Sequence, residues 1–268
     1  MKSTFTLTLA LLTAFTFTSQ LSHADDLASK GRTILEARKA TVITIELVIN
    51  QKFSFPGMPS DDMEMKIEAT GTLIGADGLT VVSLTETDPS ALFESMMAGM
   101  GQMDGFKIDS EIKTLKMILA DNTELDAEVV LRDKDLDMAF IRPVTKPEEA
   151  LPHVNLSESG DPKHLDHVVN ISRMGRVVRR AHAVSTQRVS AIVTKPRKFY
   201  IVGSSSTLQS GVGAPAFTTD GHLIGVYFLR VIKSSSGNPF AGPEDNMAVI
   251  LLPAIDIREA AEQAPPFK

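Results

Sequence analysis

The feature that most limits the fold is a long succession of short runs rich in β-branched and aromatic residues, separated by turn signals. From Thr41 the chain reads TVITIELVIN, then GTLIGADGLTVVSL, with Asp77-Gly78 placed as a hairpin turn. Further runs follow up to about Val144, with turn signals at Asp121-Asn122 and Lys134-Asp135. An Asp-Gly pair between two apolar runs is a strong local signal for an antiparallel hairpin. These runs predict an all-β fold.

A proline-rich stretch divides the run of strands in two. Residues 143–152 hold three prolines and few apolar side chains, which is typical of a linker. Five further strand-like runs follow it, and the chain closes with PAIDIREAAEQA, a short amphipathic helix opened by Pro253. Residues 27–40 are also expected to be helical. We expect a first unit over residues 25–145 and a linker, second barrel and helix over residues 146–268.

The first 24 residues have the features of a secretory signal. Lys2 gives the positive start, Phe5 to Phe17 is an apolar stretch diluted by threonines, and Ser22-His23-Ala24 supplies small residues before the cut. The segment is too short and too rich in threonine for a membrane anchor, which takes about 20 apolar residues. We expect cleavage after Ala24 and no integral membrane segment in the mature chain.

Cysteine content and charge limit the compartment and the partners. The chain has no cysteine, which excludes disulfides and thiolate metal sites and favours a bacterial periplasm or extracellular space. Loss of Lys2 with the signal leaves 26 − 33 = −7 formal charges. Such an acidic protein is a poor binder of nucleic acid or anionic membranes, so neither partner is expected.

Residues 86–109 interrupt the strand pattern with a methionine-rich insert. Met96, Met97, Met100 and Met103 fall in it, and the spacing of three of them would place these on one side of a short helix. The insert is either a lid packed on the barrel or an adaptable contact surface, since unbranched thioethers repack against varied partners.

Three segments together resemble the HtrA-type branch of the trypsin-like serine proteases. GTLIGADGLTVVSLTET is similar to the strand pair that leads to the catalytic histidine, and it places Thr85 there. ILADNTELDAEVVLRDKDLDMAFI is similar to the segment that carries the catalytic aspartate, at Asp137. The run from Ser210 to Pro215, with the later Asp220-Gly221 and Ile224-Gly225 pairs, is similar to the nucleophile motif and places Val212 at the serine.

The resemblance covers roughly residues 65–230 and implies a definite architecture. It implies two six-stranded-type antiparallel β-barrels with short N- and C-terminal helices, and an oxyanion loop at Ser210, Gly211 and Gly213. The PDZ domain that often follows in this branch is not expected, because only about a dozen residues follow the last strand.

The chemistry of the family needs a serine hydroxyl, a histidine base and an aspartate that orients the ring. Valine has no proton to give, and a threonine hydroxyl does not titrate near neutral pH. The mature histidines all lie at or beyond the linker: His153, His164, His167, His182 and His222. We therefore expect a protein without an intact catalytic triad. Asp137 is then expected to serve structurally, accepting hydrogen bonds from backbone N–H groups or a hydroxyl.

An active enzyme is the alternative. Ser210 also lies in a Ser-Gly-x-Gly context, and Glu86, next to Thr85, is a carboxylate that could act as its base. That arrangement would give a serine endopeptidase with a non-standard catalytic group.

The resemblance also points to a function without catalysis. In the family, the run after Ile-Gly pairs with the substrate backbone, and here that run includes Tyr227, Phe228 and Leu229. Pairing of this kind depends on main-chain hydrogen bonds and does not need the triad. The partner would be a peptide or an unfolded or envelope protein, bound in the former substrate cleft. Alternatively, Tyr227 and Phe228 fill the pocket.

A group of histidines and a run of arginines remain, and neither requires a further function. His164, His167 and nearby Asp161 have spacing that could hold a metal, but no further ligand is identifiable, so no metal or cofactor is expected. Four arginines form a basic run: Arg173, Arg176, Arg179 and Arg180. They are expected to form a solvated loop that pairs with acids of the first lobe. The alternative is a contact with an acidic partner or anionic envelope polymer.

Overall fold

The computed structural model describes residues 26–54, 61–88, 90, 107–203, 211–231 and 247–267. The predicted signal peptide, most of the methionine-rich insert and Ser210 lie outside the described residues. No helix in the described part of the chain is long and apolar enough to cross a membrane.

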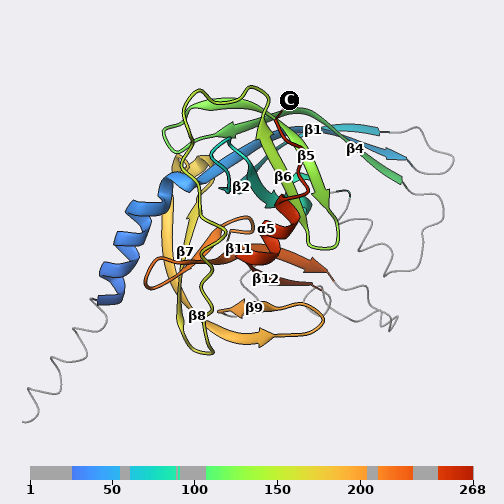
Figure 1. Ribbon diagram of the computed structural model, residues 1–268. Helices are drawn as coiled ribbons and strands as arrows, with labels where there is room; N and C mark the ends of the chain where they lie inside the picture. The colour runs from blue at the N-terminus through green and yellow to red at the C-terminus, as the bar shows by residue number, and fades with distance from the viewer. Residues whose placement is uncertain are drawn as a thin grey trace, which may run out of the picture.

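The described strands form two closed antiparallel barrels, one above the other in Figure 1. The first has the order β1-β2-β3-β6-β5-β4 and the second β10-β11-β12-β9-β8-β7. The first barrel consists of β1 (Val42–Ser54), β2 (Asp61–Leu73), β3 (Thr80–Ser83), β4 (Lys107–Ile118), β5 (Glu124–Asp133) and β6 (Met138–Pro143). The second consists of β7 (His167–Arg173), β8 (His182–Val193), β9 (Phe199–Val202), β10 (Pro215–Thr218), β11 (Leu223–Val231) and β12 (Met247–Pro253). The predicted pair of six-stranded barrels is confirmed.

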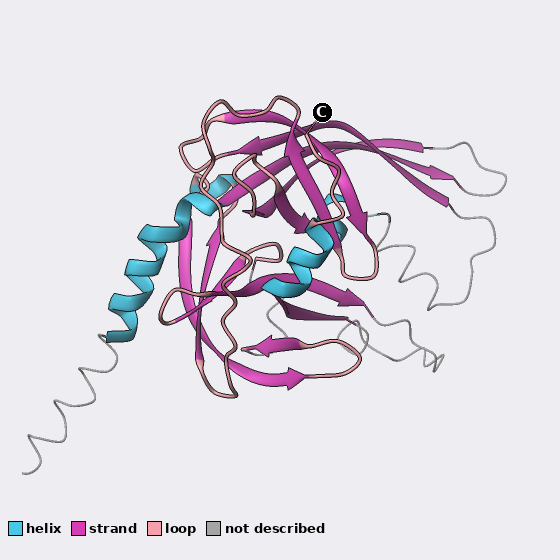
Figure 2. Cartoon of the chain, in the orientation of Figure 1, coloured by secondary structure: helices cyan, strands magenta, loops and turns pink. Residues whose placement is uncertain are grey.

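Helices are few and short in the described chain (Figure 2). Residues 26–38 are helical and lead through η1 (Lys39–Thr41) into β1. α2 (Leu84–Thr87) follows β3, η2 (Arg176–Val178) joins β7 to β8, and α5 (Ala254–Ala261) follows β12. The helices expected near residues 27–40 and at the C-terminal end are therefore present.

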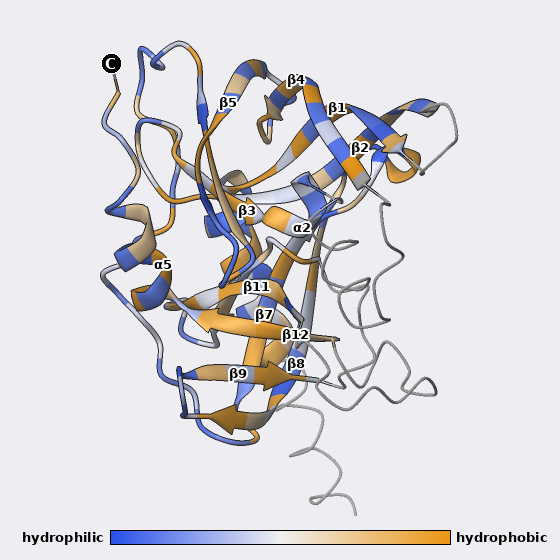
Figure 3. Cartoon of the chain, turned by 90° about the vertical axis from the view of Figure 1, so that its right-hand side faces the viewer, coloured by the Kyte–Doolittle hydropathy of each residue, from blue (hydrophilic) through white to orange (hydrophobic). Residues whose placement is uncertain are grey.

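The sequence patterns that predicted strands correspond to burial. β1 alternates between buried and partly exposed residues from Ile45 to Gln51, as expected for a strand with one face on a core. All six residues of β6 are buried, as expected for the apolar run over residues 138–141, and the one charged member, Arg142, pairs with Asp77. Figure 3 shows the same tendency in the second barrel, where β11 and β12 are coloured mainly as apolar.

Each barrel has its own core, and a third cluster joins them. Ile45 and Leu47 belong to the first core, and Tyr200 and Leu251 to the second. The joining cluster draws on both barrels and on two helices: Ile34, Val42, Val81, Met138, Phe140, Val169, Phe217, Phe228 and Ile257 are among its members. The barrels therefore pack on each other through a continuous apolar interface.

The Asp77-Gly78 turn joins β2 to β3 as predicted, and the linker packs against it. The Asp77 side chain accepts a hydrogen bond from the Leu79 N–H at 3.1 Å, and Gly78 has φ +88°. The Leu151 N–H then donates to the Ala76 carbonyl, which fixes the linker to this end of the first barrel. The Asp-Gly pair thus serves both the hairpin and the path of the chain between barrels.

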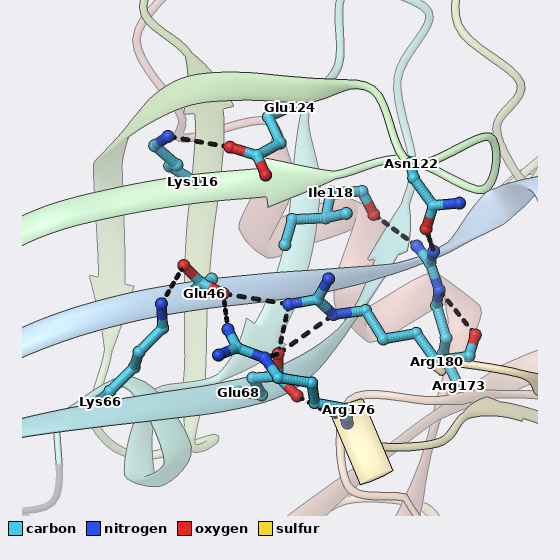
Figure 4. A network of polar contacts seen from close by, with 10 residues as sticks. All are labelled: Glu46, Lys66, Glu68, Lys116, Ile118, Asn122, Glu124, Arg173, Arg176 and Arg180. Carbon is cyan, nitrogen blue, oxygen red and sulfur yellow. Dashed lines mark hydrogen bonds and ion pairs between the residues drawn. The ribbon is translucent and has the colours of Figure 1, made fainter. Parts of the chain in front are cut away.

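The arginine run forms a clamp between the barrels (Figure 4). Arg176 and Arg180 of the β7–β8 connection form ion pairs with Glu46 of β1 and Glu68 of β2. This confirms the predicted pairing with acids of the first lobe. Arg179 of the same run is exposed.

Arg173 provides the buried part of the same connection. Its Nη1 donates to the carbonyl oxygens of Ile118 and Leu119 at 2.5 and 2.7 Å, and its Nη2 donates to Asn122 Oδ1 at 3.1 Å. The side chain belongs to the second barrel and is 7% exposed. It supplies hydrogen-bond donors to the buried carbonyl groups at the end of β4 and in the turn after it.

Arg173→Ala is expected to lower the free energy of unfolding by about 3 kcal/mol, because buried carbonyls lose charged donors. Arg179→Ala is the matched control and should change it by less than about 0.5 kcal/mol, since that side chain is exposed. Urea denaturation of both variants measures the difference. Similar losses in the two variants would contradict the assignment of Arg173 as the buried tie.

Candidate functional site

Asp137 lies where the two barrels meet, at the turn that enters β6. Its Oδ1 accepts a hydrogen bond from the Thr85 N–H at 2.8 Å. Its Oδ2 accepts from the Ser83 hydroxyl at 2.6 Å and from the Leu229 N–H at 3.0 Å. Ser83 and Thr85 belong to the first barrel and Leu229 to β11 of the second. The carboxylate, 8% exposed, therefore ties the barrels together through backbone N–H groups and a hydroxyl, the types of partner predicted for it.

A single helical turn places Thr85 beside this carboxylate. Ser83 is the N-cap of α2, and its hydroxyl accepts a hydrogen bond from the Glu86 N–H at 3.4 Å. The Thr87 hydroxyl bonds back to the carbonyls of Ser83 and Leu84, and the turn ends at Asp88. Ser83 thus serves the helix and Asp137 at once, as acceptor for one and donor to the other.

The site holds two carboxyl groups whose pKa values are raised. Burial raises the pKa of Asp137, and its hydrogen bonds act in the opposite direction. Burial, followed by the charge of Asp137, raises the pKa of Glu86 to about 7, against a hydrogen bond from the Thr70 backbone. Glu86 therefore exchanges its proton near neutral pH, within the electrostatic reach of Asp137.

The raised pKa of Glu86 predicts a fall in stability between about pH 4.5 and 7. The folded chain holds this proton more tightly than the unfolded chain, whose glutamate has the ordinary value of 4.5. The stabilisation is complete below pH 4.5 and is lost as the pH rises through 7, by about 3 kcal/mol in all. Chemical denaturation at pH 5 and 8 should show this loss in the wild type and a smaller one in Glu86→Gln. Equal pH dependence in both proteins would contradict it.

The loop at residues 211–213 reaches the same region from the second barrel. The Gly213 carbonyl accepts a hydrogen bond from the Thr72 hydroxyl at 2.8 Å, and the Gly213 N–H donates to the Tyr227 carbonyl at 2.7 Å. A Cβ on Gly213 would lie 2.1 Å from the Thr70 carbonyl oxygen and 3.8 Å from the Ser83 nitrogen. The segments around Thr85, Asp137 and Val212 are therefore brought together, although they are far apart in sequence.

The contacts of the loop limit which of its groups a substrate could reach. The Gly213 N–H is already used by Tyr227, so this donor is not available to a developing oxyanion. Val212 is 8% exposed and presents only methyl groups. Gly211 has φ +54° and its carbonyl accepts from the Ala214 N–H, which closes the turn.

The side chains predicted to bind peptide lie in the interior. Tyr227 and Phe228 are 3% and 0% exposed. The Tyr227 hydroxyl donates to Asn170 Oδ1 at 2.6 Å within the second barrel, and Phe228 belongs to the cluster that joins the barrels. Leu229 is also buried, and its N–H donates a hydrogen bond to Asp137.

The histidines of the described chain have other surroundings. His182 Nε2 lies 3.1 Å from the Val42 carbonyl oxygen, and His153 Nδ1 lies 3.0 Å from the Leu151 carbonyl oxygen. His164 and His222 are exposed. Among the described residues, the hydrogen bonds found at the Asp137 carboxylate come from no imidazole.

The region around His164 and His167 contains no cluster of metal ligands within the described residues. Asp161, the third member of the group considered from sequence, instead accepts a hydrogen bond from the Tyr200 hydroxyl at 2.7 Å and pairs with Lys198. Its carboxylate is therefore engaged at the second barrel.

Sequence reasoning missed Ser83 and Thr72 as parts of this site. The Ser83-x-x-Glu86 spacing is a capping signature that was not used, and it would have indicated only a helix start, because the contact with Asp137 comes from a segment 54 positions away. The sequence gives no local signal for the hydrogen bond from Thr72 to Gly213, because it depends on how the barrels dock.

Two comparisons with known proteins complete the description. A family model described as a trypsin-like peptidase domain matches residues 69–226, a range that holds Thr85, Asp137 and Val212. A search of curated proteins found no match.

Proposed function

Because the chain belongs to the trypsin-like peptidase family, we propose that it is a member without a working catalytic triad and that it binds peptides or unfolded proteins. We place it in the HtrA-like branch, from the order and spacing of its three motifs. We also propose that it is exported to the periplasm or the exterior, on the basis of residues 1–24.

The arrangement around Asp137 carries this proposal. In a working triad the aspartate holds the histidine ring in the correct tautomer and orientation. Here both oxygens of the Asp137 carboxylate accept hydrogen bonds, from Ser83, Thr85 and Leu229. The residue of α2 that contacts this carboxylate, Thr85, is a threonine and not a histidine. Without a base the nucleophile cannot be activated, and loss of either partner costs about a million-fold in turnover.

Binding is supported by the family's substrate and by the position of β11. In the former cleft Tyr227 and Phe228 are buried, and the Tyr227 main chain is already paired with Gly213 and Ala214. An extended peptide would therefore contact the main chain of β11 beyond Tyr227, at the Leu229 carbonyl and Val231. The Leu229 N–H is not part of that surface, because it donates to Asp137.

The alternative is an active endopeptidase that uses Ser210, and one observation favours it. Glu86 has a pKa of about 7, which suits a general base near neutral pH. In that case Glu86→Gln and Ser210→Ala would both abolish peptide cleavage.

Fluorescein-labelled reduced casein tests both halves of the proposal. The mature chain, starting at Asp25, should bind it, as measured by fluorescence anisotropy, and should release no labelled fragments over a day at pH 7. Fragment release that disappears in Ser210→Ala would establish the alternative. Absence of both binding and cleavage would contradict the binding role.

A further inference from the structure

Three strands of the first barrel extend beyond it as an arm. β1 pairs with β2 from Val42↔Thr72 to Phe53↔Asp61, and with β4 from Thr44↔Ile118 to Ser54↔Lys107. β3 pairs only with residues 71–73 of β2, and β5 only with residues 116–118 of β4. Figure 1 shows the three strands projecting together from the barrel. Residues 61–68 of β2, here named the β2 edge, thus have no strand on their outer side among the described residues, and the edge ends at Thr70, whose main chain meets Glu86 and Gly213.

We propose that the β2 edge binds an extended segment of a partner protein that alternates apolar and basic residues, by adding it as a strand. This inference rests on the proposed binding function and names a surface for it outside the former cleft. A free edge presents a row of main-chain donors and acceptors, which is what strand addition uses.

The apolar face of the β2 edge supplies contacts for such a strand. Met63 is 52% exposed, and Met65 and Ile67 are partly buried on the same face, since alternate residues of a strand point the same way. In register on β1 they lie beside Gln51, Ile49 and Leu47. A fourth strand would cover Met63 and continue this apolar face.

The polar face supplies the charge preference. Asp62 and Glu64 are both exposed on it. Glu64 lies opposite Asn50, which carries no charge, and Asn50 lies opposite Glu111 on the far side. The one cation of the β2 edge, Lys66, already pairs with Glu46 at 2.8 Å. Lys52 faces Asp62, so Glu64 is the carboxylate with the least compensation from its cross-strand neighbours.

This pattern selects the partner by its chemistry. Opposite charges facing each other across strands stabilise a pair by about 0.2–1 kcal/mol, and like charges destabilise it. A strand with lysine or arginine opposite Asp62 and Glu64 is therefore favoured over an acidic one. Charged residues on an edge strand can also prevent the addition of any further strand. If Asp62 and Glu64 had only that role, the β2 edge would bind neither a basic nor an acidic strand.

The test uses a fluorescein-labelled octapeptide of alternating lysine and valine, with a glutamate-valine octapeptide as its control. The mature chain should bind the first and not the second. Asp62→Lys/Glu64→Lys should weaken binding at least about tenfold, while Asp109→Lys/Glu111→Lys on β4 should stay within about twofold of wild type. Both pairs are mainly exposed charges, and circular dichroism checks the fold of each variant.

Hydrogen exchange gives a second readout that does not depend on a variant. Addition of the lysine-valine peptide should slow exchange at residues 61–68 and leave residues 107–115 unchanged. No binding of the lysine-valine peptide, or slowed exchange only at β4 or β11, would overturn the assignment. Reduced casein separates the two proposals: casein bound without any effect at the β2 edge would leave the proposed function in place and remove this inference.

Discussion

Asp137→Ala is expected to lower the free energy of unfolding by about 4 kcal/mol. The substitution leaves the Ser83 hydroxyl and the N–H groups of Thr85 and Leu229 without their acceptor at a buried position. Hydrogen bonds to a charged group contribute about 1.5–3 kcal/mol each, and relaxation of the surroundings recovers part of the sum. Because one of these donors belongs to the second barrel, the loss weakens the contact between barrels as well as the first barrel itself. Guanidinium denaturation measures it.

Ser83→Ala is the control for this loss. It removes one donor to Asp137 and the N-cap of α2 but keeps both backbone N–H bonds, so a loss of about 1–2 kcal/mol is expected. A loss below about 1 kcal/mol in Asp137→Ala would show that the carboxylate is not a structural tie, and would return it to consideration as a catalytic group.

Gly213→Ala is expected to cost more than about 3 kcal/mol or to prevent folding. Gly213 has φ +84°, where a side chain is strained, and its Cβ would lie 2.1 Å from the Thr70 carbonyl oxygen. The main chain of β2 or of the 211–213 loop must then move, and the loop is fixed by bonds to Thr72 and Tyr227.

Gly221→Ala separates the clash from the backbone strain. Gly221 has nearly the same φ, +85°, but the nearest atom to its Cβ is 3.8 Å away. Its loss should be about 1 kcal/mol, the cost of the left-handed conformation alone. Equal losses at the two glycines would contradict the close approach of the loop to the first barrel.

The architecture could be predicted from sequence because it depends on local signals. The Asp77-Gly78 turn, the buried run of β6 and the alternation in β1 each act within a few residues, and together they led to two antiparallel barrels. The pairing of the arginine run with acidic residues of the first barrel could also be predicted from the sequence, because a basic run in an acidic chain is expected to lie beside carboxylates.

The details of the site could not be predicted, because they depend on docking of the two barrels. Nothing near Asp137 in sequence indicates that Leu229 donates to it, 92 positions away. The raised pKa of Glu86 has a similar origin, since burial and the charge of Asp137 arise only in the folded chain. The sequence left open whether Tyr227 is exposed in a cleft. In the structure Tyr227 is buried, and its hydroxyl donates a hydrogen bond to Asn170 inside the second barrel.

We propose that Thr85 and Val212 leave this trypsin-like fold unable to form an acyl-enzyme. Intact-mass spectrometry of the mature chain after exposure to a fluorophosphonate probe tests it most directly, because the probe modifies only an activated hydroxyl. The mass is expected to stay that of the unmodified chain at pH 6, 7 and 8. A stoichiometric adduct that maps to Ser210, or to any other serine, would contradict it.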